Sequence, residues 1–227
     1  MTESQESLAS GPADAVGELL GVIAYAELVA FERLAAYASL APSLIDKAAL
    51  AELAVVEFRN CERLVNALAE RGIDPELAME PFVRPLDEFH AKTSPGDWLE
   101  GLVKAYVGDG LANDFYGELA KVLDPETHDL VSEIVGSTGE AAAFVVDRVR
   151  TAIAADPALG GRLALWARRI VGEALVQAQR VAADRDALTG LLVGQDGVGA
   201  DLTELGRVFN RILENHNGRM KALGLAS

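Results

Sequence analysis

The sequence predicts an all-α protein built around a four-helix bundle, with two additional helices at its C-terminal end. Apolar residues recur at helical spacing along most of the 227 residues, and no segment shows a convincing strand pattern. Half of the residues are hydrophobic and only 6% are aromatic, with Ala and Leu prominent, which favours helices. Proline and glycine fall between the long helical segments and separate them.

The first two helices are predicted over residues 14–41 and 44–71. Leu20, Ala24 and Phe31 share a stripe of the first helix, and Pro42 interrupts the pattern. The second helix carries a similar stripe and ends before Gly72, a residue typical of helix C-termini.

Residues 73–95 differ from the helices because they hold four prolines. That density predicts a crossover of single turns rather than a long helix. A third helix is expected over 96–122. Asp124 followed by Pro125 combines an N-cap residue with a proline suited to the first turn, and predicts a fourth helix to about residue 155.

Two further helices are predicted over residues 157–188 and 201–222. Asp156-Pro157 repeats the starting signal, and a glycine-bearing stretch separates the two helices. We therefore expect a loose tail over residues 1–12 and a single domain over 13–227, whose core bundle spans 14–155.

The lengths of the connections predict the topology. Short joins make helices one and two one antiparallel hairpin, and helices three and four another. The segment between the hairpins is long enough to run the length of a helix pair. Two hairpins joined by one long crossover make a ferritin-like four-helix bundle.

Charge and cysteine content exclude several classes of protein. The formal net charge is −15, which argues against a broad nucleic-acid surface. The single cysteine, Cys61, excludes a disulfide framework and multi-cysteine metal sites. No basic leader or long uncharged apolar run is present, so we expect a cytoplasmic protein without a membrane span.

Acidic residues on the core-facing stripes are the main functional signal. Glu27 lies 15 residues before Pro42 and Glu57 lies 15 residues after it, so both should lie about 22 Å from that turn at 1.5 Å per residue. Asp109 and Glu140 are similarly equidistant from the junction after Asp124. Carboxylates at one level of a four-helix bundle can assemble a di-metal site. A buried polar network is the alternative.

Three segments carry a family resemblance. These are GVIAYAELVAFERLAAYASLAP, DWLEGLVKAYVGDGLANDFYGELA and VGEALVQAQRVAADRDAL. Across residues 16–188 the chain resembles actinobacterial ferritin-like proteins related to the tRNA hydroxylase that acts on methylthio-isopentenyl-adenosine. The resemblance implies a non-haem di-iron site that activates dioxygen, with Glu27 and Asp109 among its ligands, and it suggests tRNA as a partner.

The chain departs from that family's pattern at its two histidine positions. Asn60 stands where Glu57-x-x-His is expected on the second helix, and Ser137-Thr138-Gly139-Glu140 lacks a histidine on the fourth. An all-oxygen set of Glu27, Glu57, Asn60, Asp109 and Glu140 would suit manganese, magnesium or calcium better than tuned iron redox chemistry. If active, the protein would be an oxygen-dependent hydroxylase-like oxidoreductase using iron or manganese. The alternative is a metal-free, non-catalytic scaffold that forms a homodimer.

Three further expectations concern the surroundings of this site. A substrate would bind beside Tyr106 and Phe144. The glycines on either side of Asp109 predict a close helix approach or a local bulge there. A group of arginines is expected on a solvated or dimer-forming face: Arg148, Arg150, Arg162, Arg168, Arg169 and Arg180.

Overall fold

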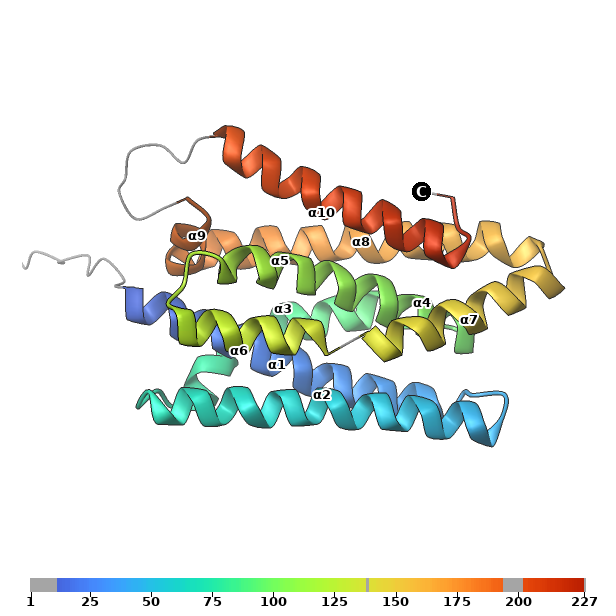
Figure 1. The fold of residues 1–227 in the computed structure, drawn as a ribbon, viewed down its shortest axis with the longest axis horizontal. Coiled ribbons are helices and arrows are strands. Elements are labelled where there is room, and N and C mark those ends of the chain that lie inside the picture. Colours follow the sequence, from blue (N-terminus) through green and yellow to red (C-terminus); the bar gives the residue numbers. More distant parts are fainter. Residues whose placement is uncertain (1–11, 138, 194–201, 227) are drawn as a thin grey trace, which may run out of the picture.

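The protein is all-α, and its long helices run side by side along one axis in the computed structural model (Figure 1). The structure describes residues 12–137, 139–193 and 202–226, and within these ranges there is no strand. The predicted tail over residues 1–12 lies outside them except for Pro12, which begins the first helix. No helix in the described ranges has the length and apolar character needed to cross a membrane.

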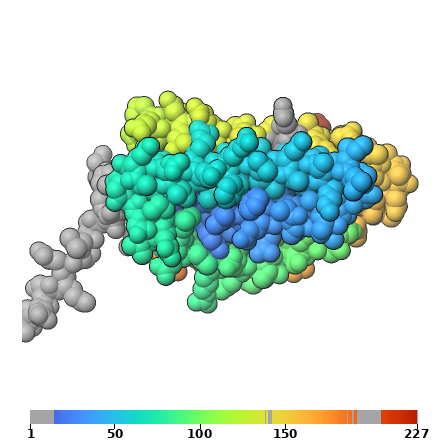
Figure 2. Space-filling model, turned by 90° about the horizontal axis from the view of Figure 1, so that it is seen from below, coloured from blue at the N-terminus to red at the C-terminus, as the bar shows by residue number. Residues whose placement is uncertain are grey.

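The first hairpin has the predicted form. Helix α1 spans Pro12–Ala38 and α2 spans Leu44–Glu70, within a few residues of the expected limits. The side chain of Ser43 caps α2 by accepting a hydrogen bond from the backbone of Asp46. Gly72, with φ of 72°, follows the end of α2. Figure 2 shows α2 along the lower face of the molecule, covering much of α1.

The prediction that prolines prevent a long helix in residues 73–95 is wrong, because α3 spans Pro75–Lys92. Asp74 caps this helix, and Pro75 occupies the first turn, where no backbone donor is needed. Pro81 and Pro85 each remove one backbone hydrogen bond. Packing compensates for these losses, since α3 lies against both α1 and α8 and buries Phe82 completely.

Helices α1 and α3 approach closely at Gly21. A Cβ atom on this glycine would lie 2.2 Å from the carbonyl oxygen of Ala78, inside any allowed contact distance. Only glycine lets the two backbones meet here without a shift. The crossover is therefore a tightly packed helix rather than a loose connection.

The third predicted helix, 96–122, contains an interruption at the expected place. Its parts are α4 (Trp98–Lys104), the π-helical turn η1 (Ala105–Asp109) and α5 (Gly110–Ala120). The predicted bulge beside Asp109 is confirmed. The predicted close approach is confirmed as well, because a Cβ atom on Gly110 would lie 2.7 Å from Cδ of Arg219.

The fourth predicted helix, 125–155, is divided in the structure. Helix α6 spans Pro125–Gly136, and α7 spans Gly139–Ala155. Asp124 caps α6 as predicted. At the other end, the hydroxyl of Ser137 donates to the carbonyl oxygen of Ile134 at 2.7 Å, a local bond that competes with continued helix. The continuous helix expected here is thus wrong at Ser137, which follows the end of α6. Thr138 lies outside the described ranges.

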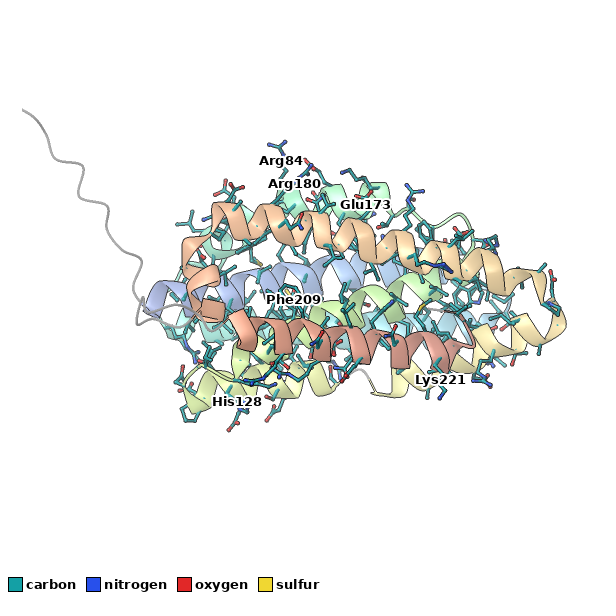
Figure 3. All side chains as sticks on the ribbon, turned by 90° about the horizontal axis from the view of Figure 1, so that it is seen from above. Arg84, His128, Glu173, Arg180, Phe209 and Lys221 are labelled. Carbon is teal, nitrogen blue, oxygen red and sulfur yellow. The ribbon has the colours of Figure 1, made fainter. Side chains whose placement is uncertain are left out.

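The remaining helices cover one face of the bundle. Helix α8 spans Ala158–Asp184, and α9 spans Asp186–Val193, so the predicted helix 157–188 is divided at Arg185. Helix α10, Leu202–Leu223, agrees with the predicted 201–222. Helices α8 and α10 lie along the upper face (Figure 3), where α8 packs on α3 and α4, and α10 packs on α5 and α7.

Two apolar clusters form the core. One includes Leu50, Leu102 and Ile170, and the other includes Leu20 and Leu64. Along α1, α2 and the η1–α5 segment, the predicted acidic residues fall between members of the first cluster and members of the second. A polar layer therefore divides the core.

Candidate functional site

The polar layer brings together acidic side chains from both halves of the first hairpin. Glu27 on α1 and Glu57 on α2 are each only 7% exposed. The carboxyl group of Glu57 lies within hydrogen-bond reach of that of Glu27. Burial, followed by the hydrogen bond and charge of Glu57, raises the pKa of Glu27 well above its ordinary value. The matching depths predicted from the sequence are confirmed for this pair.

Asn60 lies one turn after Glu57 and is also buried. Its Nδ2 donates to Oε2 of Glu27 at 3.2 Å and to the hydroxyl of Ser137 at 3.1 Å. The bond from Asn60 lowers the pKa of Glu27, although burial and Glu57 outweigh it. Asn60 therefore joins α1, α2 and the end of α6 through its amide.

Asp109 comes from the π-helical turn. Burial raises its pKa well above the ordinary value, and the charge of Glu57 adds to that effect. The charge of Asp109 in turn contributes to the raised pKa of Glu27. Three acidic residues from α1, α2 and η1 therefore share one electrostatic environment.

The fifth predicted residue, Glu140, is the second residue of α7. Its side chain lies outside the part of the chain that the structure describes. Its predicted role as a metal ligand stays a prediction.

Lys104 is a member of this layer that the sequence analysis did not single out. It is only 3% exposed, and its Nζ donates to the carbonyl oxygen of Thr93 at 2.8 Å. Burial lowers its pKa to about 7, while its charge lowers the pKa of Asp109. In a regular α-helix, a spacing of five residues places Lys104 and Asp109 about 140° apart. The π-helical turn follows Lys104 and ends at Asp109, so the regular helical spacing does not apply between them. Helical periodicity in the sequence therefore did not predict that the two residues interact.

Two buried tyrosines adjoin the acidic residues. Burial raises the pKa of Tyr37 to about 12, and the charge of Asp109 contributes. Burial also raises the pKa of Tyr116, with contributions from Glu27 and Asp109. Both phenols therefore stay neutral over the physiological pH range.

A pocket of about 270 Å³ opens beside the acidic residues. Tyr106 lines it, as predicted, but Phe144 does not. Phe144 packs instead against the apolar core, with the Arg148 guanidinium carbon 5.2 Å from its ring centre. The polar residues on the pocket wall are Glu57, Tyr106, Asp109, Asn113, Asp114 and Arg219. Apolar residues, among them Leu34, Leu50, Leu53, Val135 and Val145, supply the rest of the wall.

The donor set suits a hard cation. Carboxylate and amide oxygens are ligands that Mn²⁺ or Mg²⁺ prefers, whereas no histidine takes part in the layer. Among the side chains that the structure describes, no three His, Cys, Asp or Glu residues stand close enough together to hold a metal ion. A metal here would have to draw the acidic side chains of Glu27, Glu57 and Asp109 closer together.

Comparison with known proteins identifies a family for most of the chain. A family model described as "Ferritin-like domain, actinomycetes" matches residues 12–195. This range includes every residue of the polar layer and ends before α10. No curated protein matches the chain.

Proposed function

Because the chain belongs to the actinomycete family of ferritin-like domains, we propose that it is a metal-dependent oxidoreductase whose buried carboxylates bind a divalent metal. Manganese or iron would supply the redox chemistry and the activation of dioxygen when bound. The resemblance to the tRNA hydroxylase supports a hydroxylation-type reaction. The pocket beside Glu57 and Asp109 supports a small molecule, or one protruding group of a larger one, as substrate.

One observation carries this proposal: three acidic residues from three helical segments lie between two apolar clusters, and two of them, Glu57 and Asp109, line a pocket. Such an arrangement is unfavourable without a counter-charge, and here protons supply part of it, as the raised pKa values of Glu27 and Asp109 indicate. A divalent cation would neutralise the same charges and would release those protons.

Each residue around the proposed metal would have a separate role. Glu27, Glu57 and Asp109 would hold the metal, with Glu140 as a further candidate. Asn60 would orient Glu27 through its amide hydrogen bond. Lys104 would balance part of the negative charge from the side of Asp109. The apolar pocket wall would exclude water and place the substrate against Glu57 and Asp109.

The Asn60 hydrogen bonds favour a second candidate function, a non-catalytic scaffold. The amide satisfies Glu27 and Ser137 without any metal. In that case the polar layer would fix the register of the helices, and the protein would act by binding other chains.

Metal analysis of reconstituted protein separates the two functions. After incubation with Mn²⁺ or Fe²⁺ and removal of free metal, we expect about two equivalents per chain, as in di-metal four-helix bundles. Glu57→Gln should lose most of this metal because the charge of a buried ligand is removed. Glu62→Gln, at an exposed position of the same helix, should retain it. Trace metal in the wild-type protein, unchanged in Glu57→Gln, would leave the scaffold as the function.

A further inference from the structure

The pocket beside the carboxylates has one cationic side chain, Arg219, which comes from α10. Its Nη2 pairs with Oδ2 of Asp114 at 2.5 Å, and both side chains are about 15% exposed. Asn215 of the same helix donates to the other oxygen of Asp114 at 2.9 Å. Two residues of α10 therefore satisfy Asp114, and the Arg219–Asp114 pair is electrically neutral.

The guanidinium of Arg219 keeps donors that no described residue uses. Its Nε is buried without a hydrogen-bond partner, and Asp114 is the acceptor that the structure gives to the group. Gly110 makes room for it, since a Cβ atom there would lie 2.8 Å from Nε. A guanidinium offers five N–H donors, so Arg219 can bind an additional oxygen acceptor at the pocket wall.

Charge decides which acceptor fits. Asp114 already balances Arg219, so an anionic ligand would bring an uncompensated charge into a largely apolar pocket. An ammonium group has no lone pair and cannot accept a hydrogen bond from Arg219, so it would leave Nε without a partner. An uncharged carbonyl oxygen can accept from Arg219 without either cost.

We propose that this pocket binds an uncharged, mostly apolar molecule whose carbonyl oxygen accepts a hydrogen bond from Arg219. The pocket volume of about 270 Å³ is close to the lower end of the range of small-molecule sites, roughly 300–1,000 Å³. This assignment rests on the proposed function, because the bound molecule would be a substrate only if the protein is an oxidoreductase. It also gives α10, which lies beyond the matched family range, a part in selecting the substrate.

Three probes of equal chain length test the assignment on metal-free protein: 2-octanone, octanoate and octylammonium. Saturation-transfer NMR titrations should show 2-octanone binding about ten-fold more tightly than either charged probe. Octanoate would bring an uncompensated negative charge next to the acidic residues of the wall, and octylammonium offers Arg219 no acceptor. Arg219→Gln should weaken 2-octanone binding several-fold. Lys221→Gln, an exposed position near the end of the same helix (Figure 3), should leave it unchanged.

A second variant covers the possibility that Arg219→Gln fails to fold. Ala142 lines the pocket on α7 and takes no part in the Arg219–Asp114 pair, so Ala142→Leu should fill the pocket and abolish 2-octanone binding. Tighter binding of octanoate or octylammonium, or unchanged binding in Ala142→Leu, would overturn the assignment. Metal analysis of the same samples keeps the two proposals apart. Metal uptake without 2-octanone binding would contradict only the assignment of this pocket. Binding of 2-octanone without metal uptake would contradict only the proposed metal-dependent oxidoreductase function.

Discussion

At the scale of single residues, Asn60 sets the chemistry of the polar layer. A neutral imidazole at this position would offer a nitrogen lone pair to a metal, whereas the amide directs its NH₂ group to Glu27 and Ser137. The layer consequently has oxygen donors and no nitrogen donor of the kind that tunes iron. We therefore expect a preference for Mn²⁺ over softer metals.

Asp109 gives a prediction about pH and stability. Its pKa is raised in the folded protein, so its contribution to stability is present at low pH and is lost as the pH rises above its unfolded value near 4. Asp109→Asn should therefore raise the melting temperature of metal-free protein at pH 8, by roughly 2–4 °C for each kcal/mol relieved. This increase in melting temperature should be smaller below pH 7, where Lys104 becomes charged. In the Asp109→Asn protein that charge has lost the carboxylate that would balance it.

Differential scanning calorimetry across pH 5–8 measures this effect in chelated samples. Asp129→Asn, at an exposed site on α6, serves as the control and should change little. A lower melting temperature for Asp109→Asn at pH 8 would show that the carboxylate stabilises the fold, contrary to our account.

At the scale of helices, contacts between elements decide what local sequence does not. Prolines at two interior positions of α3 disfavour helix by about 3 kcal/mol each in isolation. The helix nonetheless forms because it packs between α1 and α8, with Phe82 in the core and Gly21 against Ala78. Long-range contacts of this kind leave no signal within the segment itself.

Gly21→Ala tests that close contact. The added Cβ would collide with the backbone of Ala78, so α1 and α3 must separate, and we expect a loss of about 1–3 kcal/mol in the free energy of unfolding. Gly117→Ala on α5 is the matched control, because nothing lies within 4 Å of its added Cβ. It should be neutral or stabilising by up to about 1 kcal/mol. Urea denaturation measures both, and equal stabilities would contradict the packing described here.

Local signals explain which parts of the fold and site the sequence predicted. Ser43 and Asp124 are caps that act within one turn, so the helix starts beside them were predictable. Glu27 and Glu57 were predictable because a tight hairpin fixes their relative depth. Lys104 and Arg219 were not, since the first acts beside a π turn and the second reaches the pocket only when α10 docks. The side chain of Glu140 stays untested.

At the scale of the whole molecule, three of the six arginines in the predicted group pair with acidic neighbours. The other three donate to backbone carbonyl oxygens: Arg150, Arg168 and Arg169. Arg148 pairs with Asp46, and Arg162 pairs with Asp97 and Glu100. Arg180 pairs with Glu88. The chain as a whole has a formal net charge of −15. Both the homodimer and the association with tRNA stay predictions, and the charge distribution disfavours the second.

Binding of bulk tRNA tests the electrostatic argument. At about 0.15 M salt we expect no saturable binding of tRNA at micromolar protein. Non-specific nucleic-acid binding usually has a dissociation constant of about 10⁻⁴–10⁻⁶ M, and it depends on Lys and Arg contacts with phosphates. Fluorescence anisotropy with labelled tRNA at several salt concentrations provides the measurement. Submicromolar binding that falls steeply with salt would instead reveal a basic surface on this acidic protein.

The most direct test of the central claim is calorimetric titration of metal-free protein with Mn²⁺ at pH 6, in two buffers that differ in ionisation enthalpy. If buried, protonated carboxylates form the metal site, binding should release about one proton or more per metal. Glu27→Gln should reduce both the affinity and the proton release, because burial and the neighbouring Glu57 raise the pKa of Glu27. Saturable binding without proton release, or no binding at all, would contradict the assignment of Glu27, Glu57 and Asp109 as a metal centre.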